Sequence, residues 1–180
     1  FVASVVARRN RRVSDKYQLE QRQLQPLPLA MSVNYTEHYV TVSRTSTICL
    51  KRVTYTVPSR LIDSRLLVRL YDDRLTLFYG TDFVLELERV YAEKGCRARS
   101  VNYRHVIDAL VKKPRAFRHS QLRDDLLPDD NYKAIWDYVD DTLTADKASY
   151  YMVKLLHLAK QSGCERQLGR FIAASITQRQ

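Results

Sequence analysis

Between residues 35 and 92, hydrophobic positions alternate with polar ones, and the runs are rich in Val, Ile, Leu, Thr and Tyr. An alternation of period two is typical of strands that bury one face. The runs predict strands at Tyr35–Arg44, Thr47–Val57, Leu66–Tyr71, Leu75–Tyr79 and Phe83–Tyr91. Short breaks between the last three suit antiparallel hairpins, and no segment between the runs is long enough for a crossover helix. The pattern therefore predicts a small antiparallel β-barrel or a strongly curled sheet.

After Gly95 the spacing of the apolar residues becomes helical. Apolar stripes at i, i+3, i+4 and i+7 predict helices around Val106–Val111, Tyr132–Leu143, Ala148–Ala159 and Leu168–Ile176. Asn102 and Asp129–Asp130 stand where N-caps belong, Pro114 ends the first stripe, and Gly163 ends the third. The second half of the chain is thus predicted to be a helical subdomain.

The first residues predict a different element. Phe1, Val2, Val5 and Val6, followed by Arg8–Arg12, indicate the final turns of a helix whose earlier part is missing from this sequence. Gln21–Pro28 has no periodicity and contains two prolines, so it predicts a linker with a domain boundary near Leu27. The predicted organisation is α+β: a short helix and linker at 1–30, the β-barrel at 31–94 and the helical subdomain at 95–180.

Composition narrows the class of protein. The chain has 180 residues, of which 45% are hydrophobic and 28% charged, and this composition excludes a disordered or low-complexity chain. Its three cysteines are widely spaced, so neither a disulfide framework nor a zinc knuckle is predicted, and a reducing cytoplasm is expected. No stretch approaches the ~20 apolar residues of a membrane span, so no membrane partner is expected.

The net charge and its distribution along the chain indicate the class of ligand. Thirty Lys and Arg residues against twenty Asp and Glu residues give a net charge of +10. Nearly all of the excess lies in residues 1–30 and 91–126. Such a localised excess attracts phosphate polyanions or anionic lipids, and it does not choose between them. A solvated basic surface without a particular partner remains the simplest alternative.

Searches for catalytic motifs find little. The chain has no Gly-rich phosphate loop, no Gly-x-Ser-x-Gly and no His-Glu-x-x-His. Four acidic doublets could in principle hold the two Mg²⁺ ions of phosphodiester chemistry: Asp72–Asp73, Asp124–Asp125, Asp129–Asp130 and Asp140–Asp141. The first, third and fourth lie in turn or cap contexts, where Asp has a structural role. We expect no catalytic residue, no metal site and no cofactor in this chain.

The clusters of basic residues are more informative about function than the acidic doublets. One set is interleaved with Tyr103 and Phe117, and a second set lies on the predicted strands and their turns. Arg and Lys in such clusters suit phosphate contacts that are indifferent to nucleotide sequence. The predicted DNA-binding residues are Arg52, Arg60, Arg69, Arg104, Lys112, Lys113, Arg115, Arg118 and Arg123.

Several short segments, taken in order, resemble the C-terminal part of the IstA-type insertion-sequence transposases, in the wider retroviral-integrase and phage Mu transposase superfamily. These segments are Arg8–Asn10, Leu24–Pro28, Tyr55–Leu61, Tyr103–Asp108 and Lys113–Phe117. The resemblance depends on the order and spacing of these segments together, and it spans essentially the whole chain. The resemblance covers a β-barrel and a helical tail.

The resemblance also carries implications about parts and partners outside this chain. It implies an upstream RNase H-like domain whose Asp, Asp and Glu triad binds two Mg²⁺ ions, and no residue here is assigned to that triad. It implies DNA as a partner, a AAA+ ATPase helper that would dock on the tail from Asp130 onward, and self-association of the full-length protein. A bacterial, nucleoid-associated location in the cytoplasm would follow.

Three functions stay open at this stage. The first is a non-catalytic DNA-binding and assembly module of a DNA transposase. The second is a metal-dependent nuclease that uses the acidic doublets. The third is a protein-interaction module whose basic charge is incidental.

Overall fold

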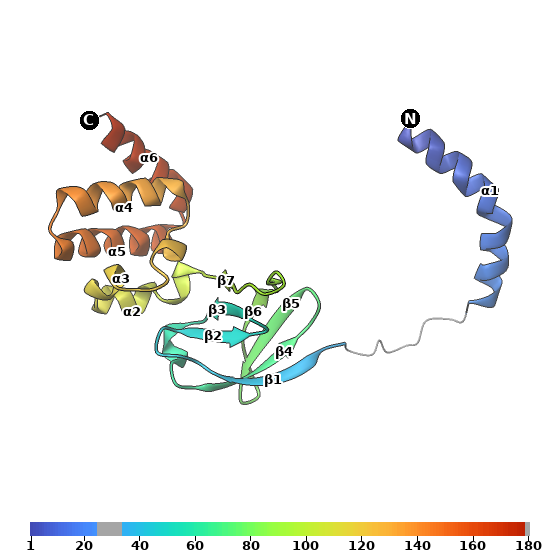
Figure 1. Cartoon of the computed structure of the whole chain (residues 1–180), viewed down its shortest axis with the longest axis horizontal. Helices are drawn as coiled ribbons and strands as arrows, with labels where there is room; N and C mark the ends of the chain where they lie inside the picture. The colour runs from blue at the N-terminus through green and yellow to red at the C-terminus, as the bar shows by residue number, and fades with distance from the viewer. Residues whose placement is uncertain (25–33, 179–180) are drawn as a thin grey trace. The chain divides into compact units, whose positions relative to one another are not determined.

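The computed structural model describes residues 1–24 and 34–178 (Figure 1). The chain divides into two compact units, Phe1–Asn34 and Tyr35–Gln180. The first unit contains helix α1, and the second contains the strands and the remaining helices that the structure describes. Residues 25–28 of the predicted linker, with the boundary near Leu27, lie outside the described residues.

Helix α1 spans Val2–Gln23 and is longer than the sequence pattern predicts. Its second half, from Ser14 to Gln23, has Tyr17 and Leu19 as its only large hydrophobic residues, so it has no apolar stripe to reveal it. Glu, Gln, Lys, Arg and Leu dominate this half, and these residues favour helices by intrinsic propensity. The interpretation of Gln21–Gln23 as linker is therefore wrong. None of the α1 side chains is buried.

The second unit contains two sheets (Figure 1). The first is antiparallel, with the order β1 (Thr36–Thr41), β4 (Arg65–Leu70), β5 (Arg74–Tyr79) and β6 (Asp82–Glu88). The second has the order β2 (Thr47–Leu50), β3 (Val53–Thr56) and β7 (Ala98–Ser100). In this sheet β7 runs parallel to β3, with Val53 beside Ala98.

The prediction of a closed barrel is wrong, because the two sheets do not close on each other. The predicted strand Thr47–Val57 is a hairpin of two short strands, β2 and β3, joined at Lys51 and Arg52. No Gly, Asn or Asp marks this turn, so the sequence gives no sign of it. The hairpin pairs with β7 instead of joining the first sheet.

The two sheets share one apolar core. Cross-strand neighbours on the inner face of the first sheet, such as Val68 and Leu77, are fully buried. Ile48, Val53 and Tyr55 of the second sheet belong to the same cluster. The buried positions of β4, Leu66, Val68 and Leu70, alternate as expected for a strand that buries one face.

A short 3₁₀-helix, η1 (Ser59–Leu61), lies between β3 and β4, and its Leu61 belongs to the core of the strands. The helical part follows β7 and has the order η2 (Tyr103–His105), α2 (Ile107–Lys112), α3 (Arg115–Arg118), η3 (Asp124–Leu126), α4 (Asp130–Thr142), α5 (Ala145–Ser162) and α6 (Glu165–Thr177). The predicted caps at Asp129 and Gly163 are confirmed, whereas Asn102 does not cap the predicted helix at Val106–Val111. The Asp129 side chain accepts a hydrogen bond from Tyr132 N, and Gly163 ends α5 with a φ of 63°. Asn102 caps η2 by accepting from Arg104 N.

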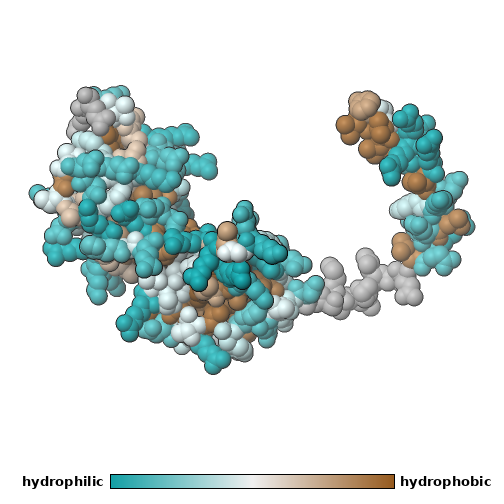
Figure 2. Space-filling view, in the orientation of Figure 1, coloured by the Kyte–Doolittle hydropathy of each residue, from teal (hydrophilic) through white to brown (hydrophobic). Residues whose placement is uncertain are grey.

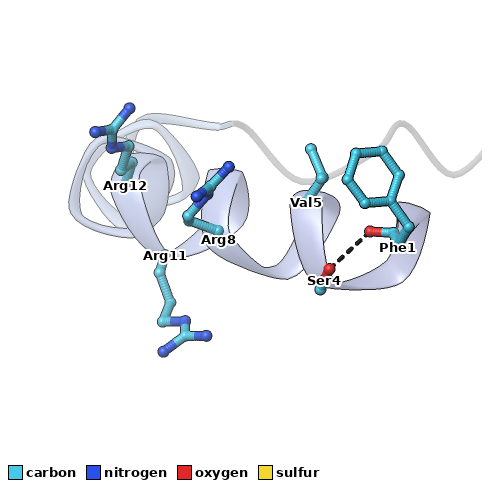
Figure 3. A pocket seen from close by; sticks show the side chains of 6 residues that line it. All are labelled: Phe1, Ser4, Val5, Arg8, Arg11 and Arg12. Atoms are coloured by element: carbon cyan, nitrogen blue, oxygen red, sulfur yellow. Dashed lines mark hydrogen bonds between the residues drawn. The ribbon is translucent and has the colours of Figure 1, made fainter.

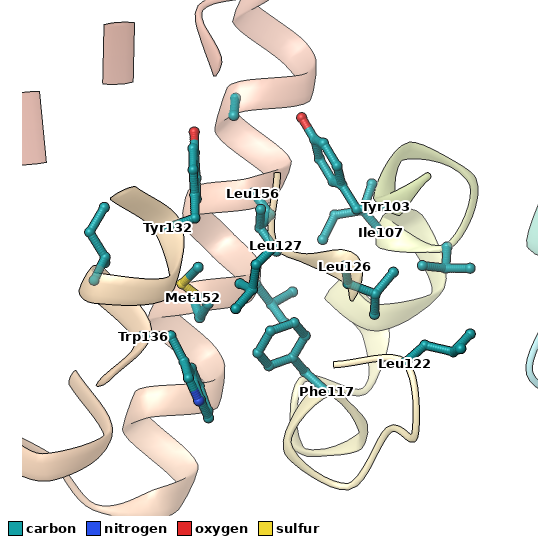
Figure 4. Packing of buried hydrophobic residues seen from close by; sticks show 14 of the residues in the cluster. Tyr103, Ile107, Phe117, Leu122, Leu126, Leu127, Tyr132, Trp136, Met152 and Leu156 are labelled. Atoms are coloured by element: carbon teal, nitrogen blue, oxygen red, sulfur yellow. The ribbon is translucent and has the colours of Figure 1, made fainter. Parts of the chain in front are cut away.

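These helices enclose a second core. Phe117 and Trp136 meet edge to face, with ring centroids 5.1 Å apart, and Met152 and Leu156 of α5 lie in the same cluster (Figure 4). The Tyr132 hydroxyl donates to the carbonyl of Glu165 at 2.9 Å and so ties α4 to α6. No helix in the described residues is both long enough and apolar enough to cross a bilayer.

Candidate nucleic-acid interface

Five of the nine predicted DNA-binding residues form ion pairs within the chain. The pairs are Arg69–Glu37 (3.0 Å), Arg104–Glu165 (3.1 Å), Arg115–Asp146 (2.7 Å), Arg118–Asp140 and Arg123–Asp124 (2.8 Å). Arg118 and Arg123 also lie 6.0 and 5.8 Å from the centroid of the Trp136 ring. Each of these arginines has a partner in the free protein, which reduces its attraction for phosphate.

The other four predicted residues are Arg52, Arg60, Lys112 and Lys113. All four are exposed, and none forms an ion pair with another described residue. They lie at three places in the second unit: Arg52 at the turn between β2 and β3, Arg60 on η1, and the two lysines at the end of α2. The structure therefore separates the predicted set into paired and unpaired cations.

The structure also brings together cations that the sequence does not connect. Ala98 N donates to the carbonyl of Arg52 at 3.2 Å, so the loop before β7 runs beside the β2–β3 turn. Lys51 and Arg52 on the turn, and Lys94 and Arg97 on the loop, are exposed and form no ion pair within the described residues. We name these four residues the tip cluster. Only the parallel pairing of β3 with β7 places the loop here, and local sequence patterns do not reveal such a pairing.

The outer face of the first sheet has a different character. A row of apolar side chains crosses its four strands, with Tyr39, Leu67, Phe78 and Phe83 as cross-strand neighbours. The Arg69 guanidinium lies 4.9 Å from the centroid of the Phe78 ring as well as from that of Tyr35. Figure 2 shows hydrophobic residues reaching the visible surface of the strand region between hydrophilic ones.

Arginines and glutamates balance on this face. Arg69 and Arg74 stand in cross-strand rows with Glu37, Glu86 and Glu88, and Arg74 pairs with Glu86 at 3.4 Å. Arg65 lies opposite Thr41, with its guanidinium 4.9 Å from the centroid of the Tyr39 ring. The net charge of the three arginines and three glutamates is zero, so this face does not attract a polyanion over distance. Arg69 is held here by Glu37 and by the two rings, in a setting that suits stacking more than phosphate binding.

Helix α1 contributes cations of its own. Figure 3 shows a shallow hollow on this helix, lined by Phe1, Ser4, Val5, Arg8, Arg11 and Arg12. The Ser4 hydroxyl donates to the carbonyl of Phe1 at 2.7 Å. The hollow is open and formed by one helix, so it does not enclose a ligand. The significance of α1 lies in its charge, since residues 1–34 carry six basic and two acidic side chains.

The acidic doublets serve the fold. Seven of their eight members pair with arginine or lysine or cap a helix: Asp72 with Arg89, Asp73 with Arg74, Asp124 with Arg123, Asp125 with Arg99, Asp130 with Lys133, Asp140 with Arg118, and Asp129 as the N-cap of α4. Within residues 1–24 and 34–178, no three His, Cys, Asp or Glu side chains gather in a way that could hold a metal ion. The predicted turn and cap contexts are confirmed.

Tyr103 and His105 are two of the groups whose pKa values are shifted by burial. Burial, and then the hydrogen bond from its hydroxyl to Glu165 Oε2 at 2.6 Å, raise the pKa of Tyr103 to about 12. Burial also lowers the pKa of His105, whose Nδ1 lies 2.8 Å from the carbonyl oxygen of Thr56. Both groups join parts of the fold: Tyr103 reaches α6, and His105 connects η2 to β3.

Comparison with known proteins agrees with this geometry. Residues 27–98 match the family model of the Mu transposase C-terminal domain, so this part of the chain is similar to that domain. The match covers all the strands from β1 to β6 and reaches the first residue of β7.

A curated relative matches over a longer stretch. An uncharacterized protein of Sinorhizobium fredii, y4jA/y4nE/y4sE, is 41% identical over 180 residues, which is 99% of this chain. The chain spans about a third of the length of that relative, 36%. No solved structure matches the chain.

Proposed function

We propose that this chain is a DNA-binding and assembly region of an IstA-type DNA transposase and that it contacts mainly the phosphate backbone. The observation that carries the proposal is the Mu transposase C-terminal domain in residues 27–98, which bears exposed, unpaired cations. Lysine and arginine that replace condensed counterions on DNA supply affinity without reading its sequence. The helical tail, the assembly partners and the location near the nucleoid are parts of the same proposal.

The ion pairs separate the residues that would contact DNA from those that would not. The four unpaired predicted residues and the tip cluster are free to meet phosphate, whereas the five paired arginines must first exchange a carboxylate partner. In this proposal the tail from Asp130 onward serves assembly, with a AAA+ ATPase helper and with other copies of the parent protein. The catalytic carboxylates and their Mg²⁺ ions would belong to another part of the parent polypeptide.

A salt titration tests the proposal. Binding of the chain to a duplex of arbitrary sequence should weaken linearly in a plot of log affinity against log salt, with a slope of about 0.9 for each phosphate contacted. Duplexes of different sequence should bind nearly equally. Equal affinity at about 50 and 300 mM salt, or no binding at either, would refute the proposal and favour the protein-interaction module.

A cleavage assay tests the remaining alternative. The chain is incubated with supercoiled DNA in Mg²⁺ and in Mn²⁺, beside a variant with Asp129→Asn and Asp130→Asn. Because these carboxylates cap α4 and pair with Lys133, we expect no cleavage by either protein. Cleavage by the parent chain that disappears in the variant would establish the nuclease function instead.

A further inference from the structure

The β2–β3 turn combines two features that rarely occur together. Lys51 and Arg52 have φ values of 49° and 66°, in the left-handed region, and both are exposed. A two-residue turn of this kind favours Asn-Gly, because a side chain with a Cβ is disfavoured at positive φ. Two long cations occupy the positions where Asn and Gly would be more stable. Residues with strained backbone conformations cluster at functional sites, so the strain at Lys51 and Arg52 suggests a function for this turn.

The neighbouring loop adds like charge at the same place. Val53 pairs with Ala98 in the parallel ladder, and the Arg52 carbonyl accepts from Ala98 N, so Arg97 follows the turn beside Arg52. Lys94 stands in the tight turn that Cys96 N closes on the carbonyl of Glu93 at 3.0 Å. Like charges brought together on adjacent strands repel each other.

The repulsion is not relieved within the protein. Arg99, two residues beyond Arg97, is neutralised by Asp125 at 2.9 Å, but the tip cluster has no such carboxylate among the described residues. Glu93, the acidic residue of the same loop, makes no ion pair with the four cations. An anion bound at the tip would remove the repulsion and offset the strain of the turn.

We propose that the tip cluster, Lys51, Arg52, Lys94 and Arg97, is a phosphate-binding site for the backbone of duplex DNA. The proposal rests on the proposed function and gives it a place: the end of the second sheet where the β2–β3 turn meets the loop before β7. The main-chain bond between Arg52 and Ala98 fixes the backbone of the turn beside that of the loop, so the segments that carry the four cations are adjacent before DNA arrives. Of the four residues, only Arg52 is in the set predicted from sequence.

The turn allows a test in which stability and binding move in opposite directions. The double variant Lys51→Asn, Arg52→Gly provides the favoured turn residues and keeps the main-chain carbonyl of position 52. We expect its melting temperature to rise by about 1 to 4 °C, because strain at positive φ is relieved. We expect its affinity for duplex DNA to fall about tenfold or more, and its salt slope to become less steep by about 1 to 2.

A matched control removes the same charge elsewhere. Arg166 and Arg170 of α6 are exposed and form no ion pair with a described residue, so Arg166→Gln with Arg170→Gln also lowers the net charge by two. This variant should bind DNA within about twofold of the parent chain at moderate salt. If both variants lose the same affinity for DNA, the net charge of the chain and not the tip cluster determines binding, and the inference is overturned.

The remaining outcomes separate the two proposals. If the parent chain binds DNA and the turn variant binds equally well, the tip cluster is not the site, while the proposed function stands. If the parent chain does not bind DNA at all, the proposed function itself fails. A third variant, Arg97→Gln, leaves the turn unchanged and should also weaken binding, and parent-like binding by this variant would exclude the loop from the site.

Discussion

Two buried threonines show how much one hydroxyl depends on its surroundings. Thr56 Oγ1 accepts a hydrogen bond from Asn102 N at 2.8 Å, at the junction of the strands and η2. Thr76 stands on the outer face of the first sheet, between Arg69 and Glu86 in the cross-strand row. Its hydroxyl is buried and has no hydrogen-bond partner. The same side chain therefore stabilises one site and costs free energy at the other.

This contrast gives a matched pair of substitutions. Thr76→Val removes an unsatisfied hydroxyl and keeps the shape, so it should raise the free energy of unfolding by about 1 kcal/mol. Thr56→Val leaves the Asn102 N–H without its acceptor and should lower the free energy of unfolding by about 1 to 3 kcal/mol. Chemical denaturation of the two variants measures both. The same sign in both variants would contradict the assignment of hydrogen bonds at these sites.

Tyr103 gives a prediction about pH. Its pKa is raised to about 12, mainly by burial, from the ordinary value of 10.0. A group whose pKa is higher in the folded state stabilises the fold below its unfolded pKa, and this contribution is lost as the pH rises toward the folded pKa. The free energy of unfolding should therefore fall between about pH 10 and pH 12.

Tyr103→Phe is the variant that checks this effect. It cannot ionise, so its free energy of unfolding should depend less on pH in this range than that of the parent chain. Tyr132, whose pKa is also raised by burial, remains in both proteins and leaves a residual dependence. Denaturation curves on either side of the ordinary tyrosine pKa measure the difference. Parallel pH profiles of the parent chain and the variant would refute the prediction.

At the scale of elements, the start of α4 can be tested in adjacent residues. Asp129 accepts from Tyr132 N, whereas Asp130 forms only an exposed ion pair with Lys133 at 2.9 Å. Asp129→Ala should lower the free energy of unfolding by about 1 kcal/mol, because the helix loses its cap. Asp130→Ala is the control, with a loss below about 0.5 kcal/mol, since exposed ion pairs contribute little. Equal losses would assign both residues the same role.

The elements also show what the sequence can predict. The α4 and α5 stripes, their caps and the inner faces of the strands follow from local periodicity, because one buried face imposes a regular spacing. The β2–β3 turn and the polar half of α1 were missed, because neither has the residue types or the apolar stripe that such rules use. The prediction of a closed barrel was wrong for a different reason. The pairing of β7 with β3 joins segments that are distant in sequence, and local patterns do not reveal it.

The candidate site shows the same limit. Composition and charge identify a basic protein, and the predicted list includes exposed cations such as Arg60 and Lys112. The list also includes Arg104 and Arg118, whose partners Glu165 and Asp140 are distant in sequence. Which arginines are neutralised is decided by the packing of helices against one another. The tip cluster depends in turn on the strand pairing that local patterns do not reveal.

At the scale of the whole molecule, the positive charge is divided between the two units. Residues 1–34 carry a net charge of +4, and residues 35–180 carry +6. The buried residues of both apolar cores lie in the second unit, and no α1 residue is buried. The second unit therefore contains both apolar cores, whereas the positive charge is shared between the two units.

This division predicts how a shortened chain behaves. A fragment of residues 35–180 should unfold cooperatively, because it keeps both cores, and it should still bind duplex DNA through the tip cluster and the other unpaired cations. Its salt slope should be less steep than that of the whole chain, by about 0.9 for each phosphate that α1 contacts. Circular dichroism establishes whether the fragment is folded, and a salt titration beside the whole chain measures the slopes. A folded fragment that does not bind DNA would place the binding surface on α1, whereas identical slopes would show that the charge of α1 serves another purpose.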